Sequence, residues 1–193
     1  VAQVAVGDYH TLTLSPGGCV SGFGSNARGQ LVHRASPVTA VDLDGGIVKV
    51  AAGGYHSLAL SWEGDLLAWG DNSSAQLGKP ANEFDDEALV LDQGYPLQVH
   101  QPIFVAGAET SNGGGVQDMA AGFLHNLALL RDGRLLGWGN NVFGQLGNGK
   151  NFSFYFGPEY TENEHNEYTG EAAPMRVRLP GARPPALSAL AAG

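Results

Sequence analysis

The stretch VAAGGYHSLALSWEGDLLAWGDNSSAQL, from Val50 to Leu77, decides the fold because the chain contains it three times. The related stretches are VAVGDYHTLTLSPGGCVSGFGSNARGQL at residues 4–31 and MAAGFLHNLALLRDGRLLGWGNNVFGQL at residues 119–146, and both align with it without a gap. A fourth copy begins as LSALAAG at residues 187–193. Self-similarity at a period of tens of residues is the signature of a repeat architecture.

Each copy has the pattern of short strands joined by tight turns. Residues Ser57–Leu60 alternate small or polar side chains with leucine, which is the period of a pleated strand. A short turn follows, which is Pro16-Gly17-Gly18, Glu63-Gly64 or Asp132-Gly133, and Asp-Gly between two apolar runs is a strong hairpin signal. Separate Pro-led segments at 37–43, 96–105 and 174–179 predict a further strand per unit. One unit is therefore expected to be about four antiparallel strands, the size of a propeller blade.

The combined motif resembles that of a known family. Its elements are Ala-Ala-Gly-x-x-His-x-Leu-Ala-Leu, Asp-Gly, Leu-x-x-Trp-Gly-x-Asn and Gly-Gln-Leu-Gly, and together they resemble the regulator of chromosome condensation repeat. That resemblance implies a seven-bladed β-propeller with four-stranded antiparallel blades. We therefore expect an all-β, incomplete propeller of about three blades over residues 1–193, in units of about 1–36, 37–95, 96–173 and 174–193.

Three blades are fewer than the four to eight that a closed propeller needs. An open stack would expose strand edges at its ends, which invites aggregation. We therefore expect the 193 residues to be a segment of a larger propeller, or to be completed by other chain material.

The residues that recur in every copy are predicted to be structural. Three histidines in three different units cannot share one metal ion, so each is expected to bond backbone groups between strands. Trp69 and Trp138, with Phe23 in the matching place, are expected in the blade core. Gln30, Gln76 and Gln145 are expected to bond the turn that leaves the blade. The predicted structural set is Gly7, His10, Gly53, His56, Trp69, Gly122, His125 and Trp138.

No cofactor, metal or catalytic site is expected. Residues 22–27 match a dinucleotide fingerprint, but the residues that follow open no helical pattern. Residues 144–150 imitate a phosphate loop, but the next residue, Asn151, lacks the hydroxyl for Mg²⁺. The lone Cys19 excludes an internal disulfide framework and a multi-cysteine zinc module. No apolar run approaches the roughly 18 residues of a membrane helix, so no membrane insertion is expected.

Charge separates two insertions from the rest of the chain. The sequence has 19 acids and 10 bases, which gives a net charge of −9. The chain therefore lacks the excess of basic residues typical of a nucleic-acid-binding domain. The insertions at 81–95 and 151–171 hold ten of the acids and none of the bases. Both follow the Gln-Leu-Gly turn, so they are expected on the same face of the propeller.

The second insertion also carries six aromatic side chains, which is unusual for a solvated loop. Two interpretations remain open: the rings bind a protein partner, or they fold back onto the propeller while the acids keep it soluble. The candidate partner-binding residues are Glu83, Phe84, Asp85, Asp86, Glu87, Phe152, Phe154, Tyr155, Phe156, Tyr160, Glu162 and Glu164.

The leading functional prediction is a non-catalytic scaffold that docks a protein partner within a larger assembly. The resemblance implies one alternative, guanine-nucleotide exchange on a small GTPase, because family members catalyse it. A further alternative is a recognition module of a multidomain enzyme such as a ubiquitin ligase. We expect an intracellular location, with a cytoplasmic or cytoskeletal one favoured over a nuclear or organellar one.

Overall fold

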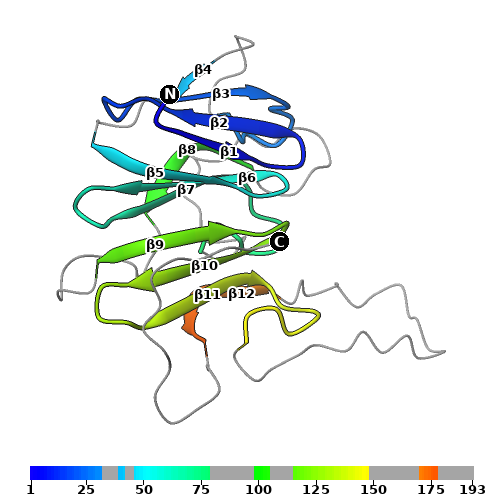
Figure 1. Cartoon of the computed structure of the whole chain (residues 1–193). Coiled ribbons are helices and arrows are strands. Elements are labelled where there is room, and N and C mark those ends of the chain that lie inside the picture. Colours follow the sequence, from blue (N-terminus) through cyan, green and yellow to red (C-terminus); the bar gives the residue numbers. More distant parts are fainter. Residues whose placement is uncertain (32–38, 42–45, 79–97, 105–114, 148–169, 178–193) are drawn as a thin grey trace, which may run out of the picture.

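The described residues, 1–31, 39–41, 46–78, 98–104, 115–147 and 170–177 of a computed structural model, form strands and turns (Figure 1). The strands are β1 (Gln3–Val6), β2 (His10–Leu14), β3 (Val20–Gly24), β4 (Thr39–Val41), β5 (Ile47–Ala52), β6 (His56–Ser61), β7 (Leu66–Asp71), β8 (Gln98–Phe104), β9 (Val116–Ala121), β10 (His125–Leu130), β11 (Leu135–Asn140) and β12 (Gly170–Arg176). The all-β prediction is confirmed. Within these ranges, no helix has the length and hydrophobicity that crossing a membrane requires.

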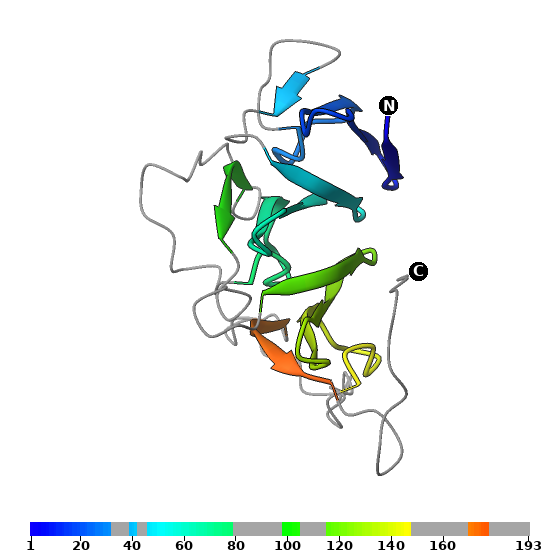
Figure 2. The ribbon, with the colours of Figure 1, turned by 60° about the vertical axis from the view of Figure 1, so that its left-hand side comes forward.

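The strands form three four-stranded antiparallel sheets. Sheet 1 has the order β1-β2-β3-β4, sheet 2 has β5-β6-β7-β8 and sheet 3 has β9-β10-β11-β12. The first strands β1, β5 and β9 contact one another along the stack, whereas β4, β8 and β12 lie further apart on the other side (Figure 2). Sheets that converge on one side and fan out on the other are the blades of an incomplete propeller, as the sequence predicts.

The predicted unit boundaries differ from this grouping in one respect. The Pro-led strands pair as the fourth strand of the sheet before them: β4 with β3, β8 with β7 and β12 with β11. The physical reason is that the third strand of each sheet would otherwise expose a row of unpaired backbone N–H and C=O groups. Pro174 lies inside β12, which is an edge strand and so tolerates a residue without an N–H.

Cross-strand pairing defines two faces on every sheet. In sheet 2, Ala52, Ser57 and Trp69 are directly paired across β5, β6 and β7, so their side chains share one face. We call the face that carries this row, and the corresponding rows of the other sheets, the leading face. The opposite, trailing face carries Leu58 and Leu60 in sheet 2. Each leading face inside the stack packs on the trailing face of the sheet before it.

Two apolar cores fill the spaces between the sheets. The core between sheets 1 and 2 joins Leu12, Leu14, Val20 and Leu31 to Ile47, Val50, Ala59 and Trp69. The core between sheets 2 and 3 joins Leu58, Leu60, Leu66, Ala68 and Leu77 to Val116, Met119, Ala128, Leu130, Leu136 and Trp138. Successive side chains of the strands of sheet 2 point to opposite faces, and apolar residues occur on both, so sheet 2 contributes to both cores.

Phe23 departs from the prediction that it is blade core. Trp69 and Trp138 are fully buried at 0% exposure, whereas Phe23 in the equivalent place is 44% exposed. The difference follows from position, because Trp69 and Trp138 each lie against a preceding sheet and no described sheet precedes sheet 1. The open end of the stack is thus a sheet face, and not the strand edge that the sequence led us to expect.

Gly53 allows two sheets to approach closely. A Cβ atom at this position would lie 2.6 Å from His56 Nδ1 and 2.7 Å from the carbonyl oxygen of Gly122 in sheet 3. We predict that Gly53→Ala lowers the free energy of unfolding by about 1–3 kcal/mol, because the added methyl group overpacks this contact. Urea unfolding followed by circular dichroism measures the effect.

Gly17→Ala is the matched control. The nearest atom to a Cβ there is Ser15 Oγ at 3.9 Å, so the change is expected to stay within about 0.5 kcal/mol. Equal effects of the two substitutions would contradict the close-approach explanation.

Candidate functional site

A hydrogen-bonded clasp joins sheets 1 and 2. The main-chain carbonyl of Gln30 accepts hydrogen bonds from Ser57 Oγ and from Trp69 Nε1, each at 2.9 Å. The Nε2 atom of His10 lies 2.8 Å from the same Ser57 Oγ. Sheet 1 thus contributes an imidazole and a carbonyl, and sheet 2 contributes a hydroxyl and an indole.

The same clasp recurs between sheets 2 and 3. The carbonyl of Gln76 accepts hydrogen bonds from Asn126 Nδ2 at 2.7 Å and from Trp138 Nε1 at 3.0 Å. His56 Nε2 lies 2.7 Å from Asn126 Oδ1. His10 and His56 therefore join successive sheets, but through a side chain of the next sheet and not through the backbone groups that the sequence prediction named.

These bonds show which nitrogen of each clasp histidine carries a hydrogen. Because the Ser57 proton is donated to Gln30, Ser57 Oγ accepts from His10 Nε2, which carries the hydrogen. Asn126 Oδ1 likewise accepts from His56 Nε2, so Nε2 carries a hydrogen in both rings. Burial lowers the pKa of His10 to about 4, with a contribution from the nearby His56. Burial also lowers the pKa of His56 to about 4.

The His10–Ser57 pair resembles a nucleophile and its base only in residue type. Ser57 is fully buried and donates its proton to a carbonyl, and an activated serine would instead donate it to the histidine. Within the described ranges, no three His, Cys, Asp or Glu side chains gather closely enough to hold a metal ion.

The repeated glutamines stabilise the turns that leave the third strand of each sheet, as predicted. We call these the exit turns: residues 25–31, 71–78 and 140–147. The side-chain Oε1 atoms of Gln30, Gln76 and Gln145 accept from the backbone N–H two residues earlier, at 2.8, 2.7 and 2.9 Å. Asparagines at the start of each turn accept from Leu31, Leu77 and Leu146 N–H.

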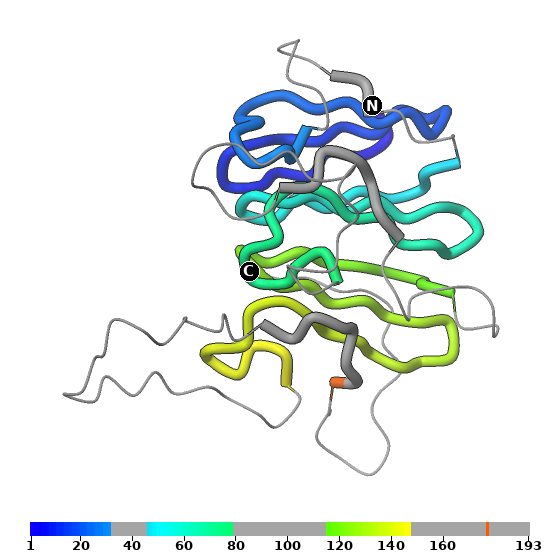
Figure 3. The backbone as a smooth tube through the Cα atoms, turned by 180° about the vertical axis from the view of Figure 1, so that it is seen from behind, coloured from blue at the N-terminus to red at the C-terminus, as the bar shows by residue number. Residues whose placement is uncertain are grey.

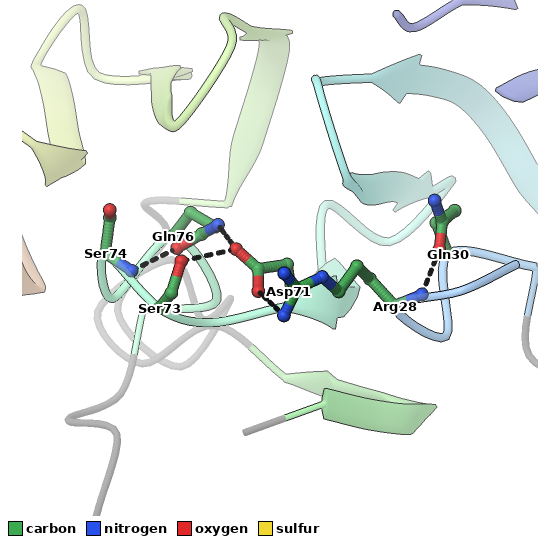
Figure 4. A network of polar contacts seen from close by, with 6 residues as sticks. All are labelled: Arg28, Gln30, Asp71, Ser73, Ser74 and Gln76. Carbon is green, nitrogen blue, oxygen red and sulfur yellow. Dashed lines mark hydrogen bonds and ion pairs between the residues drawn. The ribbon is translucent and has the colours of Figure 1, made fainter. Parts of the chain in front are cut away.

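A polar network connects two of the exit turns (Figure 4). Asp71 accepts hydrogen bonds through Oδ2 from Gln76 Nε2 and from Ser73 Oγ, both at 2.6 Å. Its Oδ1 atom lies 3.8 Å from an Arg28 guanidinium nitrogen of sheet 1. The sequence prediction missed this ion pair, because Arg28 and Asp71 lie in different copies and at different positions of the repeat.

A row of aromatic rings lies beside this network. Tyr9 and Tyr55 stack with ring centroids 4.5 Å apart, and Phe123 meets Tyr55 edge-on at 6.1 Å. The Arg28 guanidinium lies 5.9 Å from the Tyr55 ring centroid, within the range of a cation–π contact. The sequence signal for this row was the aromatic residue one or two places before each repeated histidine.

Backbone hydrogen bonds place the row and the exit turns at one end of the stack. Ser25, Asp71 and Asn140 N–H donate to the carbonyls of Tyr9, Tyr55 and Leu124, so each exit turn lies against the turn between the first two strands of its sheet. The backbone path in Figure 3 shows this end, which we call the exit end. Tyr9, Phe123 and the 90% exposed Phe143 present apolar surface there.

The predicted partner-binding residues lie outside the described residues. Glu83–Glu87 and Phe152–Glu164 belong to segments that begin after the second and third exit turns. The described residues just before them, Gly78 and Gly147, belong to the exit turns, and the shared face of the two insertions stays a prediction. One boundary is corrected, because Gly170 and Glu171 are paired in β12 and are not insertion residues.

The family model of the regulator of chromosome condensation (RCC1) repeat matches residues 1–30, 47–76 and 116–145, and a second model of this repeat matches residues 132–193. The chain belongs to this repeat family. Each of the three shorter matches spans the first three strands of one sheet and ends at the glutamine of the exit turn. No curated protein matches the chain in a sequence comparison.

Solved RCC1-type propellers have the same fold. Human WBSCR16 is 26% identical with a TM-score of 0.65 and covers 93% of this chain and 39% of its own. Prp20p from Saccharomyces cerevisiae is 22% identical with a TM-score of 0.67. The match covers 98% of this chain and 40% of the Prp20p chain. The structure of the same yeast protein bound to Kap60 is 22% identical to this chain, with a TM-score of 0.66. The match covers 98% of this chain and 39% of the yeast chain. The chain thus spans about 40% of the length of these relatives.

Proposed function

We propose that this chain is a non-catalytic interaction scaffold that docks a protein partner at the exit end of its RCC1-type blades. The observation that supports this most directly is the presence at this end of three exposed aromatic side chains, Tyr9, Phe123 and Phe143. Aromatic residues are enriched in the buried core of protein interfaces. The rigid sheets and the clasps between them supply the fixed frame that such a surface requires.

Charge supports a basic partner. Without the β12 residue Glu171, the two insertions carry nine acids and no base, while the remaining residues hold ten acids and ten bases. A partner surface with Lys or Arg between apolar side chains would complement both the acids and the rings, and this complementarity steers association. We place the scaffold in an intracellular assembly.

We predict that removing residues 151–169 abolishes capture of the partner, because it deletes the aromatic insertion but keeps β12 intact. Tagged wild-type and shortened chains are compared as baits, together with a Glu83→Lys, Asp85→Lys, Asp86→Lys, Glu87→Lys variant.

Phe143→Ala tests the described surface, and we expect at least a tenfold loss of affinity if Phe143 is an interface hot spot.

Trp62→Ala is the matched control. Trp62 is an exposed aromatic in the turn between β6 and β7, at the end of the stack opposite to Tyr55. Its loss is expected to leave capture unchanged. Partners that stay bound after deletion of 151–169 and after Phe143→Ala would contradict docking at the exit end.

Guanine-nucleotide exchange is the second candidate. Its support is the solved Prp20p structure, whose description reports binding to Gsp1p and histones. A nucleotide-release assay against a panel of small GTPases separates the two candidates. The scaffold proposal expects no acceleration of release, whereas acceleration that Phe143→Ala abolishes would favour exchange at the same surface.

A further inference from the structure

The side chain of Gln30 in the first exit turn has a buried donor that nothing accepts from. Gln30 is 0% exposed, and its Oε1 atom accepts from Arg28 N–H at 2.8 Å, which fixes the orientation of the amide. In the part of the chain that the structure describes, the Nε2 atom on the other side of this amide has no hydrogen-bond partner. A buried N–H without an acceptor is costly, so native proteins usually provide one.

The equivalent glutamines show which acceptor the repeat normally provides. Gln76 Nε2 donates to Asp71 Oδ2 at 2.6 Å, and Gln145 Nε2 donates to Asn140 Oδ1 at 2.8 Å. Each acceptor lies at the first position of its exit turn. In the first exit turn this position is occupied by Ser25, whose side chain is two heavy atoms shorter.

The backbone is the same in all three exit turns. The residue before each glutamine has a left-handed φ, with values of 78°, 59° and 76° at Gly29, Ala75 and Gly144. The first residue of each turn donates its N–H to the turn between the first two strands, at 2.7, 3.0 and 2.8 Å. With the same backbone and two fewer side-chain atoms, the first exit turn has room beside Gln30 for a group of about the size of a water molecule.

We propose that the first exit turn binds one buried water molecule, which accepts from Gln30 Nε2 in place of a side-chain oxygen. The Ser25 hydroxyl is the second polar group at this position, and it can both donate to a water and accept from it. Buried waters of this kind bond polar groups that would otherwise lack partners. Because the charge of Arg28 is paired with Asp71, we infer a neutral ligand and not an anion.

The proposed water holds a residue that belongs to two contacts between sheets 1 and 2. The main-chain carbonyl of Gln30 accepts from Ser57 Oγ in the clasp, and its side chain bonds Arg28 N–H. The Arg28 guanidinium in turn reaches Asp71 and the Tyr55 ring. A fixed Gln30 amide therefore supports the clasp and the polar network together. This inference does not depend on the proposed docking of a partner.

High-resolution crystal structures of the wild-type protein and of Ser25→Asn test the assignment directly. In the wild type we expect an ordered water within hydrogen-bonding distance of Gln30 Nε2. In Ser25→Asn we expect the introduced amide oxygen to accept from Nε2, as Asn140 does for Gln145, and the water to be displaced. A wild-type structure in which a protein atom accepts from Gln30 Nε2, or in which no water lies there, would overturn the proposal.

Unfolding equilibria provide an independent test. Ser25→Asn is expected to lower the unfolding equilibrium constant about threefold, because a side chain then makes the bond without immobilising a water. Asn140→Ser is the reciprocal change and is expected to raise the constant about threefold, since the third exit turn then needs a water.

Ala27→Asn is the matched control, because it adds the same side chain at an exposed position of the same turn. We expect it to change the unfolding equilibrium constant by less than about twofold. If Ser25→Asn lowers the constant no more than Ala27→Asn does, the proposed water site is wrong.

Discussion

Replacing Trp138 with alanine is expected to lower the free energy of unfolding by about 3–5 kcal/mol, the usual cost of deleting a buried tryptophan. The indole is fully buried between sheets 2 and 3, and its Nε1 donates to the Gln76 carbonyl at 3.0 Å. The substitution therefore leaves a cavity and removes one hydrogen bond of the clasp. Because whole domains are stable by only about 5–15 kcal/mol, this loss is a large fraction of the total.

Two further variants divide this effect. Trp138→Phe keeps most of the ring and removes the N–H, so we expect a loss of about 1 kcal/mol, since Asn126 still bonds the Gln76 carbonyl. In residues 1–193, Phe23→Ala is expected to cost less than about 1.5 kcal/mol, because the equivalent ring is half-exposed there. Urea unfolding followed by circular dichroism measures all three. Equal losses for Phe23→Ala and Trp138→Ala would contradict the positional explanation.

Acid is expected to destabilise the stack through the clasp histidines. The pKa values of His10 and His56 are about 4 in the folded chain and about 6.5 when unfolded. Between these values the unfolded chain binds more protons, so stability is complete above pH 6.5 and falls as the pH drops toward 4. Each histidine accounts for a loss of about 3 kcal/mol across this window.

His56→Gln separates this effect from the titration of carboxylates. The glutamine amide can still donate toward Asn126 Oδ1 but does not titrate, so the pH dependence between 6.5 and 4 is expected to weaken by about one proton. The free energy of unfolding is measured from urea curves at pH 7.5, 6, 5 and 4.5. An unchanged pH dependence in both His10→Gln and His56→Gln would contradict a buried neutral histidine in the clasp.

The internal repeat determined much of the architecture. Alternation in segments such as Ser57–Leu60 and the turn pairs after them predicted the antiparallel strands, and the gapless alignment predicted that Trp69 and Trp138 are equivalent. Local patterns suffice for these features because a strand alternates with a period of two and a tight turn needs particular residues. The exit-turn role of the glutamines is local as well, since each bonds the N–H two residues earlier.

Contacts between copies were beyond such local reasoning. The imidazole of His10 bonds Ser57, 47 residues away, and only the stacking of sheets decides whether its partner is a backbone or a side-chain group. The same holds for the Arg28–Asp71 ion pair and for the stacked rings of Tyr9 and Tyr55. Arg28 and Asp71 occupy different repeat positions, whereas Tyr9 and Tyr55 occupy the same one, and both pairs meet only because successive sheets share one exit end.

The make-up of each blade could be predicted from the chain's local patterns, because strand period, turn chemistry and repeat length are properties of short segments. The tertiary structure alone decided which strand completes each sheet and which side chains join one sheet to the next. It also decided that identical repeat positions have different environments. Phe23 and Trp69 occupy the same place in the motif, yet one is half-exposed and the other buried, because burial depends on the neighbouring sheet and not on the residue's own strand.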